Sequence, residues 1–421
     1  MSKQKSVAII GQGYVGLPLA NAASAAGYHV IGFDVSERTV ASLKSGKSHI
    51  DDLTDADIER MLGEGYKPSA DATVLRDVGV FVICVPTPLL QSGGPDLSMV
   101  ESAVHTIAKN FKGPVTIILE STTYPGTTDT LVKGILESYG WAHGQDFLLA
   151  FSPERVDPGR TDFTITNTPK VVGGLTEEAT KAASDFYSVF IEQVVPVRGT
   201  REAETAKLLE NTYRHVNIAL VNEMAMFCHD LGIDIWEVIR AASTKPFGFQ
   251  KFTPGPGVGG HCIPIDPNYL SYEVKKQLGY PFHFVELAQE INSGMPKYVS
   301  KRVAAILNQD KKAINGSRIL LLGVTYKPDI QDQRESPAVP VAQNLIESGA
   351  IIEFHDPHVN EWRVNGNVLQ RREDLQEAIA EADVVVLLQN HDSYDVNALA
   401  DSAKRFFDTR GTADAGKAIK L

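Results

Sequence analysis

Cysteine is scarce in this chain, with three residues among 421. Cys84, Cys228 and Cys262 show neither the close spacing of a cysteine metal site nor the even number typical of a disulfide framework. We therefore expect a protein of a reducing, cytoplasmic compartment, with no bound metal and with one cysteine available for chemistry. Cys84 lies inside an apolar run, so we expect it to pack in a core.

Long apolar runs and a positive charge balance are also missing. No apolar stretch approaches the length of a membrane span, and the opening MSKQKSVAII leads directly into an expected strand. With 52 acidic and 40 basic residues, the formal net charge of −12 argues against an extended basic surface for nucleic acid. We expect no signal peptide, no membrane insertion and no nucleic-acid partner. The length allows two or three domains with substantial cores.

A glycine-rich turn near the N-terminus carries the first functional signal. Apolar residues 6–10 run into GQGYVG, a helix-forming stretch follows, and a second apolar stretch ends at Asp34. This strand–turn–helix–strand context is typical of dinucleotide binding. Asp34 should accept hydrogen bonds from the adenosine ribose and repel a 2′-phosphate, which favours NAD over NADP, whereas Arg38 weakens that preference slightly. The candidate cofactor residues here are Gly11, Gly13, Tyr14, Val15, Gly16, Asp34 and Arg38.

Three further apolar runs, 78–88, 115–122 and 146–154, end in small or polar residues. Such runs are typical of buried parallel strands whose carboxyl ends line a ligand crevice. Thr87 and Thr122 should therefore lie beside a cofactor or a substrate.

The segment SPERVDPGR, at 152–160, follows the last of these runs. It should bring Glu154, Arg155 and Arg160 near the crevice, although a solvated polar loop explains the same residues equally well.

One long helix is expected from Thr200 to Leu231. Lys207, Asn211 and Arg214 share one of its faces because they are spaced four and three residues apart. The apolar residues of another face are Leu209, Val216, Leu220, Met224 and Phe227. A core helix with one solvated side fits this pattern, and so does an interdomain spine that forms a dimer interface.

The loop FTPGPGVGGHCIPIDP, at 252–267, concentrates glycine and proline around Cys262. Glycine lets the backbone approach a ligand closely, and Asp266 should cap a helix that begins near Pro267. The positive end of that helix favours a nearby thiolate, the nucleophilic form of cysteine. A glycine-rich turn that holds an inert cysteine is the alternative interpretation.

A polar junction, NQDKKAINGS, precedes a second α/β pattern. Helices are expected at 267–308, before the junction, which ends the central domain. The expected elements of the second pattern are a strand at 317–324, a helix near 337–349, and strands at 351–357, 382–390 and 405–411. The loop TYKPDIQDQRESP places Lys327 and Arg334 where an anion would bind.

We therefore predict an α/β fold: two Rossmann-like domains with parallel sheets, joined by a long central helix and a helical middle domain. The predicted domains are an NAD-binding domain at 1–199, a central helical dimerisation domain with the cysteine loop at 200–312, and a nucleotide-sugar domain at 313–421.

Six motifs, in order, resemble the UDP-glucose/GDP-mannose dehydrogenase family over essentially the whole chain. They are GQGYVGLPLA, STTYPGTT, SPERVDPG, the helix from Lys207 to Asn211, GVGGHCIPIDP and YKPDIQDQRESP. The resemblance implies NAD as cofactor, a UDP-sugar as substrate and a homodimer formed through the central helix.

The resemblance also implies a four-electron oxidation of the sugar C6 hydroxymethyl group to a carboxylate. Cys262 would form a thiohemiacetal and then a thioester. Lys207 and Asn211 would stabilise oxyanions, and Asp266, Glu154 and Thr122 would form the base system, in an order the sequence leaves open. Lys327 should contact the nucleotide sugar and Arg334 the cofactor. The implied substrate contacts are Glu154, Arg155, Val156, Lys207, Asn211, Arg214, Phe252, Gly255, Gly259 and Lys327.

The nature of the sugar depends on finer features. SPER at 152–155 and GGHC at 259–262 resemble the branch that acts on UDP-N-acetylhexosamines. The stretch KPFGFQKF, Lys245–Phe252, lacks the His-Pro-Arg pattern of the N-acetylmannosamine (ManNAc) enzymes, so it favours the UDP-N-acetylglucosamine (UDP-GlcNAc) 6-dehydrogenases. His261 either polarises Cys262 or is a structural residue.

Several alternatives remain at this stage. The substrate alternatives are the N-acetylgalactosamine sugar UDP-GalNAc, UDP-ManNAc and UDP-glucose. A two-electron hydroxy-acid dehydrogenase shares the first domain but leaves Cys262 and the C-terminal domain unexplained. A non-catalytic module that binds NAD and a nucleotide sugar would bind without turnover.

Overall fold

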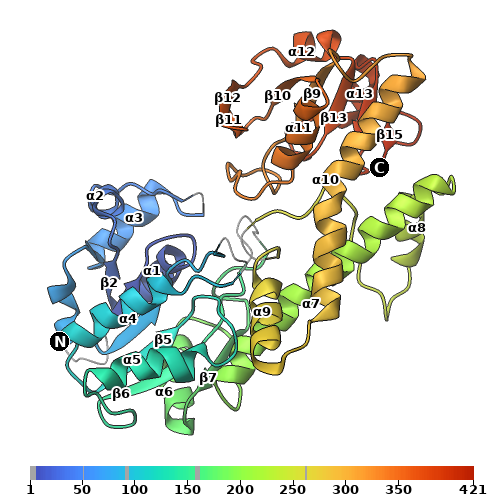
Figure 1. Ribbon diagram of the computed structural model, residues 1–421. Coiled ribbons are helices and arrows are strands. Elements are labelled where there is room, and N and C mark those ends of the chain that lie inside the picture. The colour runs from blue at the N-terminus through green and yellow to red at the C-terminus, as the bar shows by residue number, and fades with distance from the viewer. Residues whose placement is uncertain (1–5, 51, 91–93, 157–161, 261–262) are drawn as a thin grey trace. The chain divides into compact units, whose positions relative to one another are not determined.

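The computed structural model describes residues 6–50, 52–90, 94–156, 162–260 and 263–421 (Figure 1). Three residues discussed above, Arg160, His261 and Cys262, lie outside the described residues. The chain forms two compact units, which we call the first unit (Met1–Glu210 with Asn268–Leu278) and the second unit (Asn211–Pro267 with Gly279–Leu421).

The first unit contains an eight-stranded sheet with the order β3-β2-β1-β4-β5-β6-β7-β8. Apart from β6 and β7, the neighbouring strands that the described residues form in this sheet run parallel. Their bounds are β1 Ser6–Ile10, β2 His29–Phe33, β3 Lys67–Ser69, β4 Val80–Ile83, β5 Val115–Leu119, β6 Phe147–Phe151, β7 Lys170–Gly174 and β8 Val194–Pro196. The order of the first six strands is that of a dinucleotide-binding fold.

Two cores cover the two faces of this sheet. Alternation along β1 directs Ala8 and Ile10 into one core and Val7 and Ile9 into the other. Helices α4, η3 and α5 contribute to the first core, and α1, α2, α3 and α6 to the second. The helix bounds are α1 Gly16–Ala25, α2 Glu37–Lys44, α3 Asp55–Gly63, η2 Ala72–Asp77, α4 Ser98–Asn110, η3 Thr127–Val132, α5 Lys133–Ser138 and α6 Glu177–Tyr187.

The second unit contains a five-stranded parallel sheet with the order β10-β9-β13-β14-β15 and a separate antiparallel hairpin of β11 and β12. The strand bounds are β9 Arg318–Leu322, β10 Ile351–His355, β11 Glu361–Val364, β12 Asn367–Gln370, β13 Val384–Leu387, β14 Phe406–Asp408 and β15 Ile419–Lys420. Helices α10 and α11 pack in one of its cores, and α12 and α13 in the other. Their bounds, with that of α8, are α8 Ile235–Ala242, α10 His283–Gln309, α11 Ala338–Glu347, α12 Leu375–Glu381 and α13 Val396–Ser402.

Two helices contribute residues to both units: α7, Thr200–Asp230, and α9, Asp266–Leu278. Helix α7 extends over 31 residues because its sequence contains neither glycine nor proline. Gly232, with φ of 69°, follows its end. Helix α9 begins at Asp266, one residue before the predicted start.

The predicted fold class is confirmed: an α/β protein with two largely parallel sheets and long helices between them in the chain. The division into three domains stays a prediction. The sequence analysis did not identify β3, β7, β8, β15 or the β11–β12 hairpin, because these strands have two to five residues each and little apolar periodicity. Among the described residues, we find no helix whose length and apolar content would suit a membrane crossing.

Glu204 fixes the start of α7 within the first unit. This fully buried side chain accepts hydrogen bonds from the backbone N–H groups of Gly126 (2.6 Å) and Thr128 (3.0 Å). The Thr128 hydroxyl donates a third bond, at 2.6 Å. Burial raises the pKa of Glu204 to about 7, while these donors act in the opposite direction.

We predict that Glu204→Ala lowers the free energy of unfolding by roughly 3 kcal/mol, because three buried donors lose their acceptor. The measurement is the midpoint of urea unfolding at pH 8, where the carboxylate is largely ionised. Glu202→Ala, at an exposed position of the same helix turn, is the matched control and should change stability by less than about 0.5 kcal/mol. Equal effects of the two substitutions would contradict this role of Glu204.

Candidate active site

The turn after β1 has the geometry of a phosphate cradle. Gly11 has φ of 93°, and a Cβ atom there would lie 2.7 Å from the carbonyl oxygen of Cys84. A Cβ atom on Gly16 would lie 1.9 Å from the carbonyl oxygen of Gly11. No described atom lies within 4 Å of the Cβ position of Gly13, so a ligand can approach the backbone there. The turn leads into the N-terminus of α1, where backbone N–H groups favour a pyrophosphate.

Asp34 follows the end of β2 and is tied to the same turn. Its carboxylate accepts hydrogen bonds from the backbone N–H groups of Gln12 (2.9 Å) and Ser36 (2.8 Å). Arg38 lies exposed in the first turn of α2. The predicted cofactor residues Gly11 to Gly16 and Asp34 are therefore brought together.

Thr87 and Thr122 lie beyond the ends of β4 and β5; β4 pairs with β1, and β5 pairs with β4. The backbone carbonyl of Thr87 accepts a hydrogen bond from the Tyr269 hydroxyl of α9. Because parallel strands end at one edge, both threonines lie on the same side of the sheet as the glycine turn, as predicted.

A buried charge network holds Glu154. One carboxylate oxygen of Glu154 accepts hydrogen bonds from the backbone N–H groups of Arg155 (2.8 Å) and Val156 (2.5 Å). The other lies 3.7 Å from Nζ of Lys170, which forms a 2.9 Å ion pair with Glu120. Although burial alone lowers the pKa of Lys170, the two carboxylates raise it above its ordinary value, so Lys170 stays charged.

The sequence analysis missed Lys170 and Glu120. Both are almost completely buried, with side-chain exposures of 4% and 0%. A charged residue at the border of a buried strand is the signal that could have found them, since such a charge needs a partner. Cys84 lies beside this network, and burial raises the pKa of its thiol well above the ordinary value, in agreement with its predicted place in the core.

Lys207 and Arg155 connect α7 to the Glu154 segment within the first unit. Nζ of Lys207 donates to the carbonyl oxygen of Glu154 at 2.6 Å. Arg155 forms an ion pair with Glu210 at 2.7 Å and donates to the carbonyl oxygen of Pro169. The structure thus supports the grouping of Glu154, Arg155 and Lys207.

In the second unit, Asn211 meets Asp266. The Asn211 side-chain amide donates to the Asp266 carboxylate at 2.5 Å, and both residues are buried. Because α7 is continuous, Asn211 lies one turn beyond Lys207 on the same face, followed by the half-buried Arg214.

The loop before Cys262 packs against the loop that follows β9. Cβ atoms on Gly257 and Gly259 would lie 2.9 Å from Cβ of Pro337 and 2.7 Å from the carbonyl oxygen of Glu335, so glycine is required for this contact. The backbone N–H of Gly255 donates to the side chain of Asn222 at 3.0 Å.

Phe252 and Arg410 border the same loop. The ring of Phe252 packs edge-on against Tyr213, with ring centroids 5.8 Å apart. A Cβ atom on Gly255 would lie 3.0 Å from the guanidinium of Arg410, which donates to the carbonyl oxygen of Leu388. Arg410, which sequence reasoning assigned only to a strand, therefore lies beside this glycine-rich loop.

Lys327 and Arg334 lie on the loop between β9 and α11. The carbonyl oxygen of Lys327 accepts from the Thr325 hydroxyl at 2.7 Å. The guanidinium of Arg334 makes two hydrogen bonds to Asp332, at 2.8 and 2.6 Å, which fixes its position on the loop.

A cavity of about 420 Å³ lies in the second unit. It is lined by the glycine-rich loop around Gly257, the loop between β9 and α11, and helices α7 and α10. Its lining includes His215 of α7, Asn292 of α10, Val258 and Pro264. The second unit thus has room for a small ligand group beside the loop that leads to Cys262.

Family models now identify the chain. The NAD-binding domain of the UDP-glucose/GDP-mannose dehydrogenase family matches residues 5–191, its central domain 201–294 and its UDP-binding domain 320–415. A UDP-N-acetyl-D-mannosamine dehydrogenase of Methanococcus maripaludis is 34% identical over 99% of this chain and 96% of its own length. The chain belongs to this family. It is an NAD-dependent nucleotide-sugar dehydrogenase with a UDP-sugar-binding domain.

Solved structures agree with this assignment. The UDP-D-ManNAc dehydrogenase of Pyrococcus horikoshii matches with a TM-score of 0.89 and 32% identity, over 99% of this chain and 98% of that one. The NDP-N-acetyl-D-galactosaminuronic acid dehydrogenase of Methanosarcina mazei matches with a TM-score of 0.81 and 28% identity, over 98% and 94%. The family predicted from the motifs is confirmed, whereas the names of these three proteins give no support to the UDP-GlcNAc branch.

His215 is a buried histidine of the cavity wall, with 1% of its surface exposed. Its Nδ1 lies 3.3 Å from the side-chain nitrogen of Asn292, and its Nε2 has no hydrogen-bond partner among the described residues. Burial lowers its pKa to about 4.

We predict that His215 makes the protein less stable at acid pH. The unfolded chain binds a proton near pH 6.5 and the folded chain only near 4, so the free energy of unfolding decreases as the pH falls through this window, by about 2 kcal/mol at pH 5. His215→Gln should reduce the difference between urea midpoints at pH 7 and pH 5. The exposed His283→Gln serves as control, and an unchanged pH dependence in His215→Gln would contradict the prediction.

Proposed function

We propose that this protein oxidises the C6 hydroxymethyl group of a UDP-N-acetylhexosamine to a carboxylate, with UDP-ManNAc as the first candidate substrate. The observation that carries the proposal is the pair Lys207 and Asn211. Both are buried, one turn apart on a continuous helix, and each is held by a neighbouring polar group, Glu154 and Asp266. A lysine and an amide in this arrangement can stabilise an oxyanion.

Cys262, identified from the sequence, supplies the nucleophile in this proposal. Its thiolate adds to the C6 aldehyde to give a thiohemiacetal, whose oxidation gives a thioester. Water then attacks the thioester carbonyl, and the thiolate leaves as the carboxylate is formed. Overall, the alcohol and one water lose four electrons, which two NAD accept as hydrides when bound.

Asp266 and Glu154 are the carboxylates assigned to water activation, with Thr122 as a hydroxyl that helps to position the water. The amide of Asn211 orients the carboxylate of Asp266. Two backbone donors and Lys170 hold the carboxylate of Glu154 in position, where it would accept a hydrogen bond from water or substrate.

The residues that would hold NAD fit the dinucleotide well. The close contacts at Gly11 and Gly16 and the open approach at Gly13 suit a pyrophosphate at the start of α1. Asp34 would bind the adenosine ribose. The further proposed contacts are Tyr14, Val15, Arg38, Thr87, Thr122 and Arg334.

The proposed substrate contacts of the first unit are Glu154, Arg155, Val156 and Lys207. Those proposed for the second unit are Asn211, Arg214, Phe252, Gly255, Gly259 and Lys327. Lys327 and the neighbouring loops would bind the diphosphate and the sugar.

The choice of sugar rests on two opposing signals. The names of the Methanococcus and Pyrococcus proteins favour UDP-ManNAc, and that of the Methanosarcina protein favours a galactosamine sugar. The stretch KPFGFQKF favours UDP-GlcNAc instead, because it has no arginine. The identities of 28–34% extend over nearly the whole chain, so we give them more weight than eight residues.

The proposed assembly is a homodimer formed through α7. Tyr213, Leu220 and Phe227, spaced seven residues apart, form an exposed stripe with exposures of 45%, 52% and 46%. A seven-residue spacing of large apolar residues is typical of helices that pack against other helices. Leu209, also predicted on this face, is 66% exposed, whereas Val216 and Met224 are partly buried.

The first test counts NADH formed per sugar consumed, with excess NAD and limiting UDP-ManNAc, UDP-GlcNAc, UDP-GalNAc or UDP-glucose. We predict two NADH per sugar, with UDP-ManNAc the fastest substrate. Cys262→Ser should lower acid formation by more than about a thousandfold, because it removes the nucleophile. Cys228→Ser, at a buried cysteine of α7, is the matched control and should keep two NADH per sugar.

One NADH per sugar would contradict the thioester mechanism and favour a two-electron dehydrogenase. No NADH with any of the four sugars, despite NAD binding, would favour the non-catalytic module. A faster reaction with UDP-GlcNAc would overturn the substrate assignment alone.

We predict that Leu220→Glu and Phe227→Glu convert a dimer into a monomer, because a charge on the stripe would lose its hydration in the interface. Sedimentation equilibrium of the full chain measures the mass directly. Val189→Glu, at a 54% exposed apolar position outside α7, should leave the mass unchanged. A monomeric unsubstituted protein, or a dimer that survives both changes, would refute this interface.

A further inference from the structure

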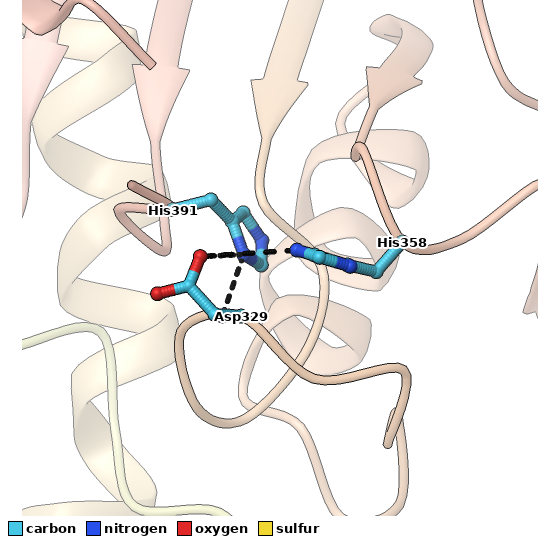
Figure 2. A group of neighbouring side chains, drawn as sticks. All are labelled: Asp329, His358 and His391. Atoms are coloured by element: carbon cyan, nitrogen blue, oxygen red, sulfur yellow. Dashed lines mark hydrogen bonds and ion pairs between the residues drawn. The ribbon is translucent and has the colours of Figure 1, made fainter. Parts of the chain in front are cut away.

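Three metal-ligating side chains meet at the carboxyl edge of the second sheet, apart from the residues assigned above to catalysis (Figure 2). Asp329 lies on the loop after β9, His358 follows β10 and His391 follows β13. Because β10, β9 and β13 are neighbours in a parallel sheet, the segments after them converge at one edge.

The distances within this cluster are close to those of a metal site. Oδ1 of Asp329 lies 3.8 Å from Nε2 of His358 and 3.8 Å from Nδ1 of His391. All the potential ligand atoms lie within 4.8 Å of one another. Around a tetrahedral Zn²⁺ with bonds of about 2.0–2.1 Å, ligand atoms are about 3.4 Å apart. A contraction of a few tenths of an ångström would therefore bring Asp329 to both histidines.

Asp356 orients His391 as the outer carboxylate of a metal site does. Its buried carboxylate lies 3.0 Å from Nε2 of His391 and also accepts from the backbone N–H groups of Val324 and His358. In the neutral ring, a proton on Nε2 leaves the lone pair on Nδ1, the nitrogen that faces Asp329. Carboxylate–histidine pairs of this kind fix the tautomer and the ring orientation of metal ligands.

In this structure, atoms of the cluster accept hydrogen bonds from backbone N–H groups. Nδ1 of His391 accepts from the backbone N–H of Asp329 at 3.0 Å, and Oδ1 of Asp329 accepts from the backbone N–H of Asp392 at 2.9 Å. A carboxylate oxygen can accept a hydrogen bond and still bind a metal. Nδ1 of His391 has one lone pair, so the backbone N–H of Asp329 must move away before Nδ1 can bind a metal. Asp329 has a positive φ of 59°, in the left-handed region that aspartate adopts more readily than most residues.

We infer that Asp329, His358 and His391 bind a divalent transition metal, with Zn²⁺ as the first candidate. Two imidazoles and one carboxylate are a ligand set that Zn²⁺ uses, with the fourth position left to solvent. Solvent has access because the side chains of Asp329 and His358 are 40% and 33% exposed. The metal would tie the loop that carries Lys327 to the ends of β10 and β13.

The test titrates Zn²⁺ into the full, tag-free chain after removal of metals with a chelator, and measures binding by calorimetry. We expect one Zn²⁺ per chain and at least a tenfold weaker binding in His358→Gln and Asp329→Asn. Co²⁺ in place of Zn²⁺ should give visible absorption bands of a low-coordinate site in the unsubstituted protein. His283→Gln, at an exposed histidine of the same unit, should bind as tightly as the unsubstituted chain.

His358 is a suitable position for this test because it is partly exposed, so its replacement should leave the fold intact. Absence of Zn²⁺ binding would overturn the inference and leave the cluster as a set of hydrogen bonds that holds the loop. Binding that survives His358→Gln, or that His283→Gln weakens equally, would also overturn it. None of these readouts depends on dehydrogenase activity, so they are independent of the proposed function.

Discussion

A stripe of buried polar residues along α7 is the constraint on which the placement of the functional loops depends. Glu204, Lys207, Asn211, His215 and Asn222 recur at intervals of three, four or seven residues, so they lie on one side of the helix. A buried polar group without a partner costs several kilocalories per mole, so these side chains favour partners from elsewhere in the chain. Their partners lie on loops, at the starts of η3 and α9, and on α10, where Asn292 lies beside His215 and Asn222.

Four of the five side chains bond to segments that carry a family motif or a proposed site residue. Glu204 holds the start of η3, Lys207 the Glu154 segment and Asn211 the carboxylate of Asp266. Asn222 holds Gly255 in the loop that leads to Cys262. Loops have few apolar contacts of their own, so a rigid helix that supplies hydrogen-bond partners at fixed intervals can determine where they lie.

Patterns that are local in the sequence predicted their part of the structure well. The glycine turn with its strand, helix and Asp34 was recognisable because its chemistry requires close spacing along the chain. The common face of Lys207 and Asn211 followed from helical periodicity alone. The strands β3 and β15 were missed because two or three residues give no periodicity, and they form through pairing with distant segments.

Interactions between distant segments account for most of what the sequence could not show. Lys170 and Glu120 are 50 residues apart, and the charge that each places at the border of a buried strand does not tell which partner it has. Their pairing depends on the sheet, in which β6 alone separates β5, which Glu120 follows, from β7, which Lys170 begins. The same holds for Arg410 beside Gly255, and for Asp329, His358 and His391, which are 29 to 62 residues apart in the sequence but follow three neighbouring strands. The preference for UDP-GlcNAc inferred from KPFGFQKF disagrees with the names of the relatives for a related reason. Eight consecutive residues form only a small part of a binding site.

The environment of Glu154 shows how these distant interactions serve chemistry. Burying Lys170 between two carboxylates stabilises the fold little, since the desolvation of the charges offsets most of their attraction. The arrangement does, however, orient Glu154 through both carboxylate oxygens and through its carbonyl group, which accepts from Lys207. Glu154, the proposed base, and Lys207, the proposed oxyanion-stabilising cation, are thus held together by the same short segment. In the proposed reaction, one site stabilises an alkoxide and then directs water to a thioester, and such positioning would be worth more than the modest stability that the buried ion pair supplies.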